Sequence, residues 1–263
     1  MSDRDGIVRI AAVGDLHHTR STEPSARDVL AAAGREADVL VLCGDLTDHG
    51  TVEEAQDLAR EIHSAVTIPV VAVLGNHDFS GGKQDEVKRV LCESGIRVLD
   101  GEAVEIKGVG FAGVKGFCGG FGKRALGPWG EDIIKHFVRE AVDEALKLES
   151  ALARLRGRPT IAVLHYSPIQ ETVEGEPVEI FAFLGSSRLE EPLSRYPVQA
   201  VFHGHAHRGQ PEGKTAQGIP VFNVSIQLLR QSYPERPPFR IFEVPVGEPI
   251  REQPRGPRRQ QAQ

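Results

Sequence analysis

The chain has 263 residues, 40% of them hydrophobic, which is enough for one large domain or two small ones with a sizeable core. A net charge of −6 argues against a general nucleic-acid or anionic-membrane surface, although bound metal ions can reverse the field locally and attract a phosphate group. No apolar run approaches the roughly 20 residues of a membrane span, and no signal-peptide pattern precedes the first strand. Three scattered cysteines without a Cys-x-x-Cys pair predict reduced thiols and a cytoplasmic protein.

The first half of the chain alternates apolar strands with helical segments. This alternation predicts βαβ units and a sheet that is covered on both faces. Strands are expected at 8–13, 39–42 and 70–74, and helices at about 24–36, 52–65 and 83–94.

The middle of the chain changes character. Segments 103–106 and 109–114 read as a hairpin around Lys107-Gly108. The glycine-dense segment 116–122 is incompatible with a regular element. A long amphipathic helix is then predicted at about 131–155.

The second half returns to strands. They are expected at 160–164, 198–202, 221–224 and 239–244, with a long acidic insertion at about 167–187. From Gly247 the chain is rich in Pro, Gln and Arg, which predicts a disordered tail at 247–263 after a single domain at 1–246.

Short polar motifs follow five of the predicted strands. In α/β sheets such carboxyl ends of strands share one rim, so these motifs should gather two carboxylates, one carboxamide and several imidazoles. They read Gly14-Asp15-Leu16-His17, Gly44-Asp45, Gly75-Asn76-His77-Asp78, His165 and Gly204-His205-Ala206-His207. Taken singly, each polar residue could equally cap a turn or a helix.

This ligand set predicts a pair of metal ions. A mixed shell of nitrogen and oxygen suits Zn, Fe, Mn, Co or Ni better than Ca or Mg, and the sequence leaves the identity open. A carboxylate such as that of Asp45 can bridge two ions, and ions about 3.5–4 Å apart can clamp both oxygens of an in-line displacement. Two divalent ions, two carboxylates and a bridging hydroxide leave one positive charge, which favours a phosphodiester monoanion over a monoester dianion.

In their order, these motifs resemble those of the calcineurin-like metallophosphoesterases, and the match spans about residues 10–207. The resemblance implies a four-layer αββα sandwich with a dimetal site at the sheet rims. It implies one ion held by Asp15, His17, Asp45 and His207, and a second held by Asp45, Asn76, His165 and His205. It also implies that His77 contacts the phosphate and aids the leaving oxygen, with Asp78 orienting its ring.

The chain is most similar to small single-domain bacterial phosphodiesterases, some of which act on cyclic nucleotides. Many of that branch carry a second histidine directly after the lone one, where this chain has Tyr166, so cyclic-nucleotide activity is not carried over. We expect Tyr166, His18, Phe117 and Phe121 to contact substrate, whereas packing or a hydrogen bond to a ligand suits His203 better than ligation.

These features predict a metal-dependent phosphohydrolase that acts on a small phosphate ester. The favoured reaction is phosphodiester hydrolysis by a hydroxide bound to both ions. The alternatives are a phosphomonoesterase, a nuclease, which the acidic composition disfavours, and a non-catalytic scaffold with the same fold. Oligomeric state and natural substrate stay open.

Overall fold

Four strands of the first half and one from near the end of the chain build a five-stranded sheet in the order β11-β1-β2-β3-β4. The structure is a computed structural model that describes residues 6–19 and 26–246. Strands β1 to β4 run parallel, and β11 pairs antiparallel with β1. The strands are β1 (Ile7–Val13), β2 (Val39–Cys43), β3 (Val70–Val73), β4 (Arg97–Val98) and β11 (Arg240–Pro245).

A second sheet has six strands in the order β5-β6-β7-β8-β10-β9. The predicted hairpin forms its first edge, and Lys107 and Gly108 both have positive φ, as a two-residue type I′ turn requires. Strands β6, β7, β8 and β10 run parallel. The strands are β5 (Glu102–Ile106), β6 (Val109–Gly113), β7 (Thr160–Val163), β8 (Val198–His203), β9 (Glu212–Lys214) and β10 (Pro220–Asn223).

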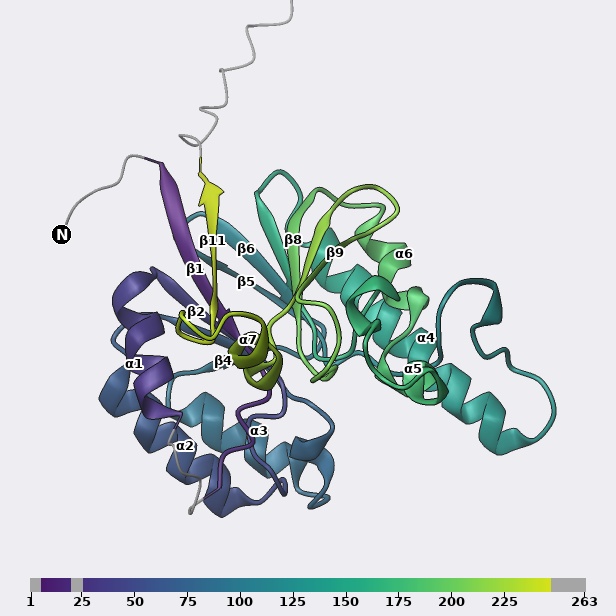
Figure 1. Cartoon of the computed structure of the whole chain (residues 1–263), viewed down its shortest axis with the longest axis horizontal. Coiled ribbons are helices and arrows are strands. Elements are labelled where there is room, and N and C mark those ends of the chain that lie inside the picture. The colour runs from purple at the N-terminus through teal and green to yellow at the C-terminus, as the bar shows by residue number, and fades with distance from the viewer. Residues whose placement is uncertain (1–5, 20–25, 247–263) are drawn as a thin grey trace, which may run out of the picture.

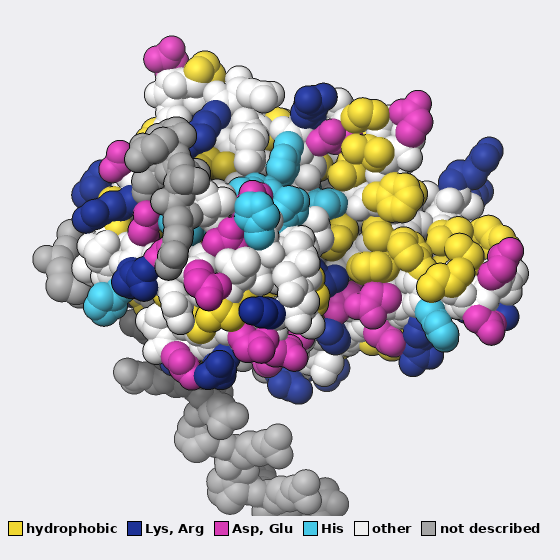
Figure 2. Space-filling model, turned by 90° about the horizontal axis from the view of Figure 1, so that it is seen from below, with side chains coloured by type: hydrophobic (Ala, Val, Ile, Leu, Met, Phe, Trp, Pro, Cys, Tyr) yellow, Lys and Arg dark blue, Asp and Glu magenta, His cyan; other side chains and the backbone are white. Residues whose placement is uncertain are grey.

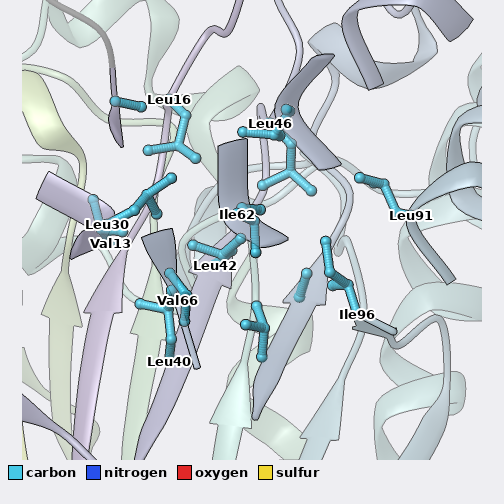
Figure 3. Packing of buried hydrophobic residues seen from close by; sticks show 14 of the residues in the cluster. Val13, Leu16, Leu30, Leu40, Leu42, Leu46, Ile62, Val66, Leu91 and Ile96 are labelled. Atoms are coloured by element: carbon cyan, nitrogen blue, oxygen red, sulfur yellow. The ribbon is translucent and has the colours of Figure 1, made fainter. Parts of the chain in front are cut away.

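Three amphipathic helices cover the outer face of the first sheet (Figure 1). They are α1 (Arg27–Glu36), α2 (Val52–Ala65) and α3 (Gln84–Glu93). Helix α2 begins with a capping box between Thr51 and Glu54. Alternate residues of the strands, among them Leu40 and Leu42, pack against Leu30 and other helix residues in this outer core (Figure 3).

Two further layers complete the sandwich. The remaining strand residues, such as Val41 of β2 and Phe111 of β6, form a second core between the sheets. Helices α4 (Asp132–Ala153) and α6 (Glu190–Leu193) pack on the outer face of the second sheet. Because the central strands β2, β3, β6 and β7 are apolar on both faces, the middle of each sheet is buried on both sides. The expected αββα sandwich is therefore confirmed.

Several short elements were absent from the predictions. Strands β4 and β9 are short edge strands, and α7 (Ile226–Ser232) follows β10. The insertion at 167–187 contains α5 (Phe181–Leu184) and short 3-10 turns, although no element was expected there. The 3-10 turns of the chain are at His77–Phe79, Gly122–Arg124, Glu171–Val173, Val178–Ile180 and Ser187–Leu189. Residues 24–25 of the first predicted helix and the tail at 247–263 lie outside the described residues.

The two sheets meet at the carboxyl ends of their strands. The Gly14 amide donates to the Val224 carbonyl at 2.8 Å, and the Ile226 amide donates to the Gly14 carbonyl at 3.0 Å. A Cβ on Gly14 would lie 3.4 Å from the Gly204 Cα, so the loops after β1 and β8 pack backbone against backbone. This junction brings the polar motifs of both sheets to one place.

Candidate metal centre

The loop after β1 presents Asp15 and His17, both with positive φ (57° and 43°). Asp15 is fully buried, and both of its carboxylate oxygens accept from the His205 amide at 3.0 Å. Burial opposes ionisation of Asp15, but its hydrogen bond with His207 and the nearby imidazoles lower the pKa of this carboxyl well below its usual range. Asp15 is therefore an anion held at the junction of the sheets.

Asp45 lies between two sets of imidazoles. Its Oδ2 is 3.7 Å from the His17 Nε2, and its Oδ1 is 3.4 Å from the His165 Nε2. Asp45 is also buried and has a φ of 47°. Its two oxygens thus face histidines from different sheets.

Hydrogen bonds determine which nitrogen of each histidine is left to bind an ion. The Nδ1 of His165 lies 2.9 Å from the Cys43 carbonyl, and the Nε2 of His205 lies 3.1 Å from the Phe183 carbonyl. Because a carbonyl only accepts, these nitrogens carry the protons. In the neutral rings this leaves the Nε2 of His165, beside the Asn76 Oδ1, and the Nδ1 of His205 as the nitrogens able to ligate an ion, as is usual for metal-binding histidines.

His17 follows the same rule and provides a test of whether the residues fit a metal. Its Nδ1 lies 2.9 Å from the Asp48 carboxylate, and its Nε2 is buried with no hydrogen-bond partner. An unpartnered buried nitrogen is costly unless something binds it. The donor atoms around it fit a transition-metal ion.

The histidines and aspartates form three overlapping donor groups, each with its donor atoms within 4.8 Å of one another. Asn76 adds its Oδ1, which lies 2.9 Å from the His165 Nε2. All seven residues predicted to be ligands therefore gather in one place. The groups are Asp15, His17 and His207; Asp45, His165 and His205; and His17, Asp45 and His77.

Glycines next to the ligands allow this close approach. A Cβ on Gly44 would lie 2.5 Å from the His165 ring, and one on Gly75 would lie 2.2 Å from the Asp45 Oδ1. A Cβ on Gly204 would lie 2.5 Å from the Asp15 Oδ2. Real side chains do not approach so closely, so each of these positions requires glycine.

His77 and Asp78 differ in their surroundings. The His77 side chain is 39% exposed, and its Nδ1 lies 2.8 Å from the Asp48 carbonyl. Asp78 is fully buried and accepts from the amides of Thr47 and Gly75, both at 2.8 Å. The expectation that Asp78 orients the His77 ring is wrong for this structure, because Asp78 instead ties the loops after β2 and β3 together.

Sequence reasoning missed Asp48. Its carboxylate accepts a hydrogen bond from the His17 Nδ1, and its main-chain carbonyl accepts one from the His77 Nδ1. The only signal was its place three residues after Asp45 in the same loop. That spacing alone could not separate it from an ordinary turn residue.

A model of one protein family covers most of the chain. The family is described as calcineurin-like phosphoesterase, and its model matches residues 8–209. The chain belongs to this family of phosphate-ester hydrolases. The resemblance drawn from the motifs is thereby confirmed.

One relative of this phosphoesterase is named a probable glycerophosphodiester phosphodiesterase, GpdQ, of Arcobacter nitrofigilis. The two are 24% identical over 184 residues, which are 65% of this chain and 57% of the relative. The chain thus spans little more than half the length of this relative.

Solved structures share the fold of this phosphoesterase. The phosphopantetheinyl hydrolase PptH of Mycobacterium tuberculosis matches with a TM-score of 0.63 and 15% identity, over 89% of this chain and 95% of that one. GAP50, the anchor in the inner membrane complex of Plasmodium, matches with a TM-score of 0.54 and 13% identity, over 85% and 73% of the two chains. At such identities the likeness shows the fold alone. No helix in the described part of the chain combines the length and apolarity that a bilayer crossing needs.

Two other histidines of the phosphoesterase lie beside the donor groups in the sequence but have different neighbours. His203 is buried between the Gly204 carbonyl and the Thr172 hydroxyl, each 2.8 Å from a ring nitrogen, and burial lowers its pKa to about 4. His18 is 4% exposed, and its Nδ1 lies 3.9 Å from the Glu61 carboxylate of α2. The expected substrate contact of His18 is not supported, because its ring is buried.

The aromatic residues expected to contact substrate are mostly packed. Tyr166 is 6% exposed, and its ring centroid is 4.5 Å from that of His205. Phe117 packs against Tyr166 and Phe137 with centroids 6.0 and 5.0 Å away, and Phe121 belongs to a small core with Leu184. Tyr166 therefore supports a predicted ligand directly, while Phe117 and Phe121 stabilise the loop at 116–122.

A half-buried cation lies next to this aromatic group. The Lys115 ammonium is 4.9–5.3 Å from the ring centroids of Phe79, Phe117 and Tyr166, and it donates to the Gly116 carbonyl at 2.8 Å. Burial lowers the pKa of Lys115. Its ring contacts are cation–π interactions, which hold the loop against the strand that bears His165.

Proposed function

We propose that this phosphoesterase hydrolyses small phosphodiesters with two transition-metal ions, Mn, Fe or Zn. The two ions would share the carboxylate of Asp45. Asp15, His17, Asp45 and His207 would hold one ion, and Asp45, Asn76, His165 and His205 would hold the other.

The placement of Asp45 is the observation that carries this proposal. Its Oδ2 faces His17 and its Oδ1 faces His165, at 3.7 and 3.4 Å. A carboxylate that served a single ion would need imidazoles on one side only. Imidazoles on both sides support a carboxylate bridge between two ions, the arrangement that clamps both oxygens of an in-line displacement.

When bound, the ions would polarise the phosphate and supply a hydroxide at neutral pH. The residues of the chain would orient the ester and donate a proton to the leaving oxygen. His77 is a partly exposed imidazole of the site, and its ring centroid is 4.4 Å from that of His17. Because its Nδ1 faces the Asp48 carbonyl, its Nε2 is the nitrogen available to the leaving oxygen.

A diester is favoured over a monoester for two reasons. Two divalent ions with Asp15, Asp45 and one hydroxide have a net charge of one, which matches a phosphodiester monoanion. The name of the Arcobacter relative is that of a phosphodiesterase. A phosphomonoesterase is the second candidate, and the relative rates on bis(p-nitrophenyl) phosphate and p-nitrophenyl phosphate separate the two.

Removing a ligand should abolish the reaction. We expect Asp45→Ala and Asn76→Ala to reduce turnover of bis(p-nitrophenyl) phosphate at least about 1,000-fold, because the metal contribution to the barrier is several kcal/mol. Chelation should silence the wild type, and added Mn or Zn should restore it. Asp143→Ala, at an exposed aspartate paired with Arg139, is the matched control and should stay active. Undiminished turnover of either ligand variant would refute the proposal.

A scaffold without activity is the candidate from another class. It would keep the fold and leave the donor groups empty. Elemental analysis of freshly purified protein, together with the turnover assay, decides between the two. A metal content near zero that does not rise on incubation with Mn or Zn would favour the scaffold.

A further inference from the structure

Large apolar side chains are exposed on two segments, one of which adjoins the metal centre. Val178 and Phe183, in the insertion after His165, are 70% and 58% exposed. Trp129, just before α4, and Ile133, in its first turn, are 62% and 72% exposed. Apolar side chains gather beside the histidine cluster in the space-filling view (Figure 2). We call the surface formed by Val178, Ile180, Phe183, Trp129 and Ile133 the apolar shelf.

Backbone hydrogen bonds join the two segments of the apolar shelf. The Gly119 amide donates to the Ala182 carbonyl at 2.7 Å, and the Gly120 amide donates to the Gly185 carbonyl at 2.9 Å. The Leu126 amide, three residues before Trp129, donates in turn to the Gly119 carbonyl at 2.7 Å. The loop before α4 is therefore held against α5.

The apolar shelf is also tied to the metal ligands. The Phe183 carbonyl lies 3.1 Å from the His205 Nε2. The Ser167 amide, two residues after His165, donates to the Leu184 carbonyl at 3.0 Å, and the Ser186 amide donates to the Ser167 carbonyl at 3.0 Å. The shelf thus begins at the predicted ligands and has a defined position relative to them.

Charge and position indicate what covers the shelf. Contiguous exposed apolar surface usually marks a binding site. The same segments carry Glu131, Asp132, Glu176 and Glu179 beside Lys123, Arg124 and Lys135, which leaves no net positive charge to attract an anionic bilayer. A protein bound permanently over Phe183 would cover the surface beside His205. A flexible apolar chain that belongs to the substrate itself carries no charge and leaves the site open once the product departs.

We propose that the preferred substrates are amphiphilic phosphodiesters, whose alkyl or acyl chain lies on the apolar shelf while the phosphate is at the metal centre. This inference rests on the proposed function and specifies its substrate class. A fully buried methylene gains about fourfold in affinity. On an open shelf one side of the chain stays in water, so about twofold per methylene is expected.

A chain-length series tests the proposal. Metal-loaded full-length protein is assayed with p-nitrophenyl phosphodiesters that carry methyl, butyl or octyl groups, below their micellar concentrations. We expect kcat/KM to rise about 100-fold from methyl to octyl. In Phe183→Ser and Val178→Ser the octyl-to-methyl ratio should fall at least about fivefold, because each removes apolar contact with the chain. Leu146→Ser, at a leucine of α4 that is 52% exposed outside the shelf, is the matched control and should keep the wild-type ratio.

The outcomes separate the two proposals. Hydrolysis of the methyl ester without any gain from longer chains overturns the amphiphilic substrate and leaves phosphodiesterase activity standing. No hydrolysis of any ester by the metal-loaded protein overturns both. Light scattering that shows a dimer, broken by the shelf variants while the octyl-to-methyl ratio stays flat, would instead assign the shelf to a second copy of the chain.

Discussion

At the scale of single residues, the site depends on which ring nitrogen carries a proton. His17, His165 and His205 each have one nitrogen next to an oxygen acceptor outside the predicted ligands, so the other nitrogen faces the donor groups. The left-handed φ of Asp15 and Asp45 places their carboxylates among these rings. Backbone strain of this kind costs about 1–3 kcal/mol per residue and persists where the surroundings enforce it.

His77 should act on the leaving group, since its side chain is partly exposed and its Nδ1, not its Nε2, faces the Asp48 carbonyl. We expect His77→Asn to lower kcat about 100-fold or more for an alkyl leaving group. The loss should be much smaller for p-nitrophenolate, which leaves without a proton. Parallel kinetics on the two esters, with metal content measured in each preparation, provide the check. Equal losses on both esters would assign His77 to positioning instead of proton transfer.

At the scale of elements, each strand delivers its polar motif by ending at the rim. Strands β1, β2 and β3 of one sheet run parallel to one another, as do β7 and β8 of the other, so their carboxyl ends lie together. Short loops then position the side chains, and Asp78 holds two of these loops together. Distance along the chain therefore has little bearing on proximity in the site.

The hairpin between β5 and β6 carries a correctable strain. Lys107 has a φ of 52°, which suits asparagine better than lysine. We expect Lys107→Asn to raise the free energy of unfolding by about 1 kcal/mol. The substitution also removes the exposed ion pair between Lys107 and Asp38, which contributes little to the free energy of unfolding. Urea titration measures the change, and Lys107→Ala, which keeps the unfavourable φ, should give no gain. A lower midpoint for the asparagine variant than for the alanine variant would contradict this view.

At the scale of the whole molecule, the metal centre lies where the two sheets meet. Asp15, Asp45 and Asn76 come from the first sheet, while His165, His205 and His207 come from the second. Bound ions would therefore cross-link the sheets as well as serve catalysis.

Metal removal should accordingly lower thermal stability. A metal ion at 100 times its Kd stabilises the folded state by about 2.7 kcal/mol. For a chain of this size we expect Tm to rise by about 5 °C or more on adding Mn or Zn to chelated protein. Calorimetry provides the measurement. His205→Ala should lose most of the shift and Asp143→Ala should keep it, whereas an equal shift in both would place the ions elsewhere.

The sequence by itself determined the order of the main elements, the αββα class and the residues that gather at the site. It could do so because burial on both faces makes the central strands apolar throughout, and because the ordered motifs at the strand ends are specific. Only the tertiary structure decided the partners of each group. Asp78 holds two loops together, Asp48 accepts hydrogen bonds from His17 and His77, and Phe183 exposes its side chain while its carbonyl accepts from His205. These contacts join residues far apart in the chain, where hydrogen bonding and burial depend on packing that no local pattern records.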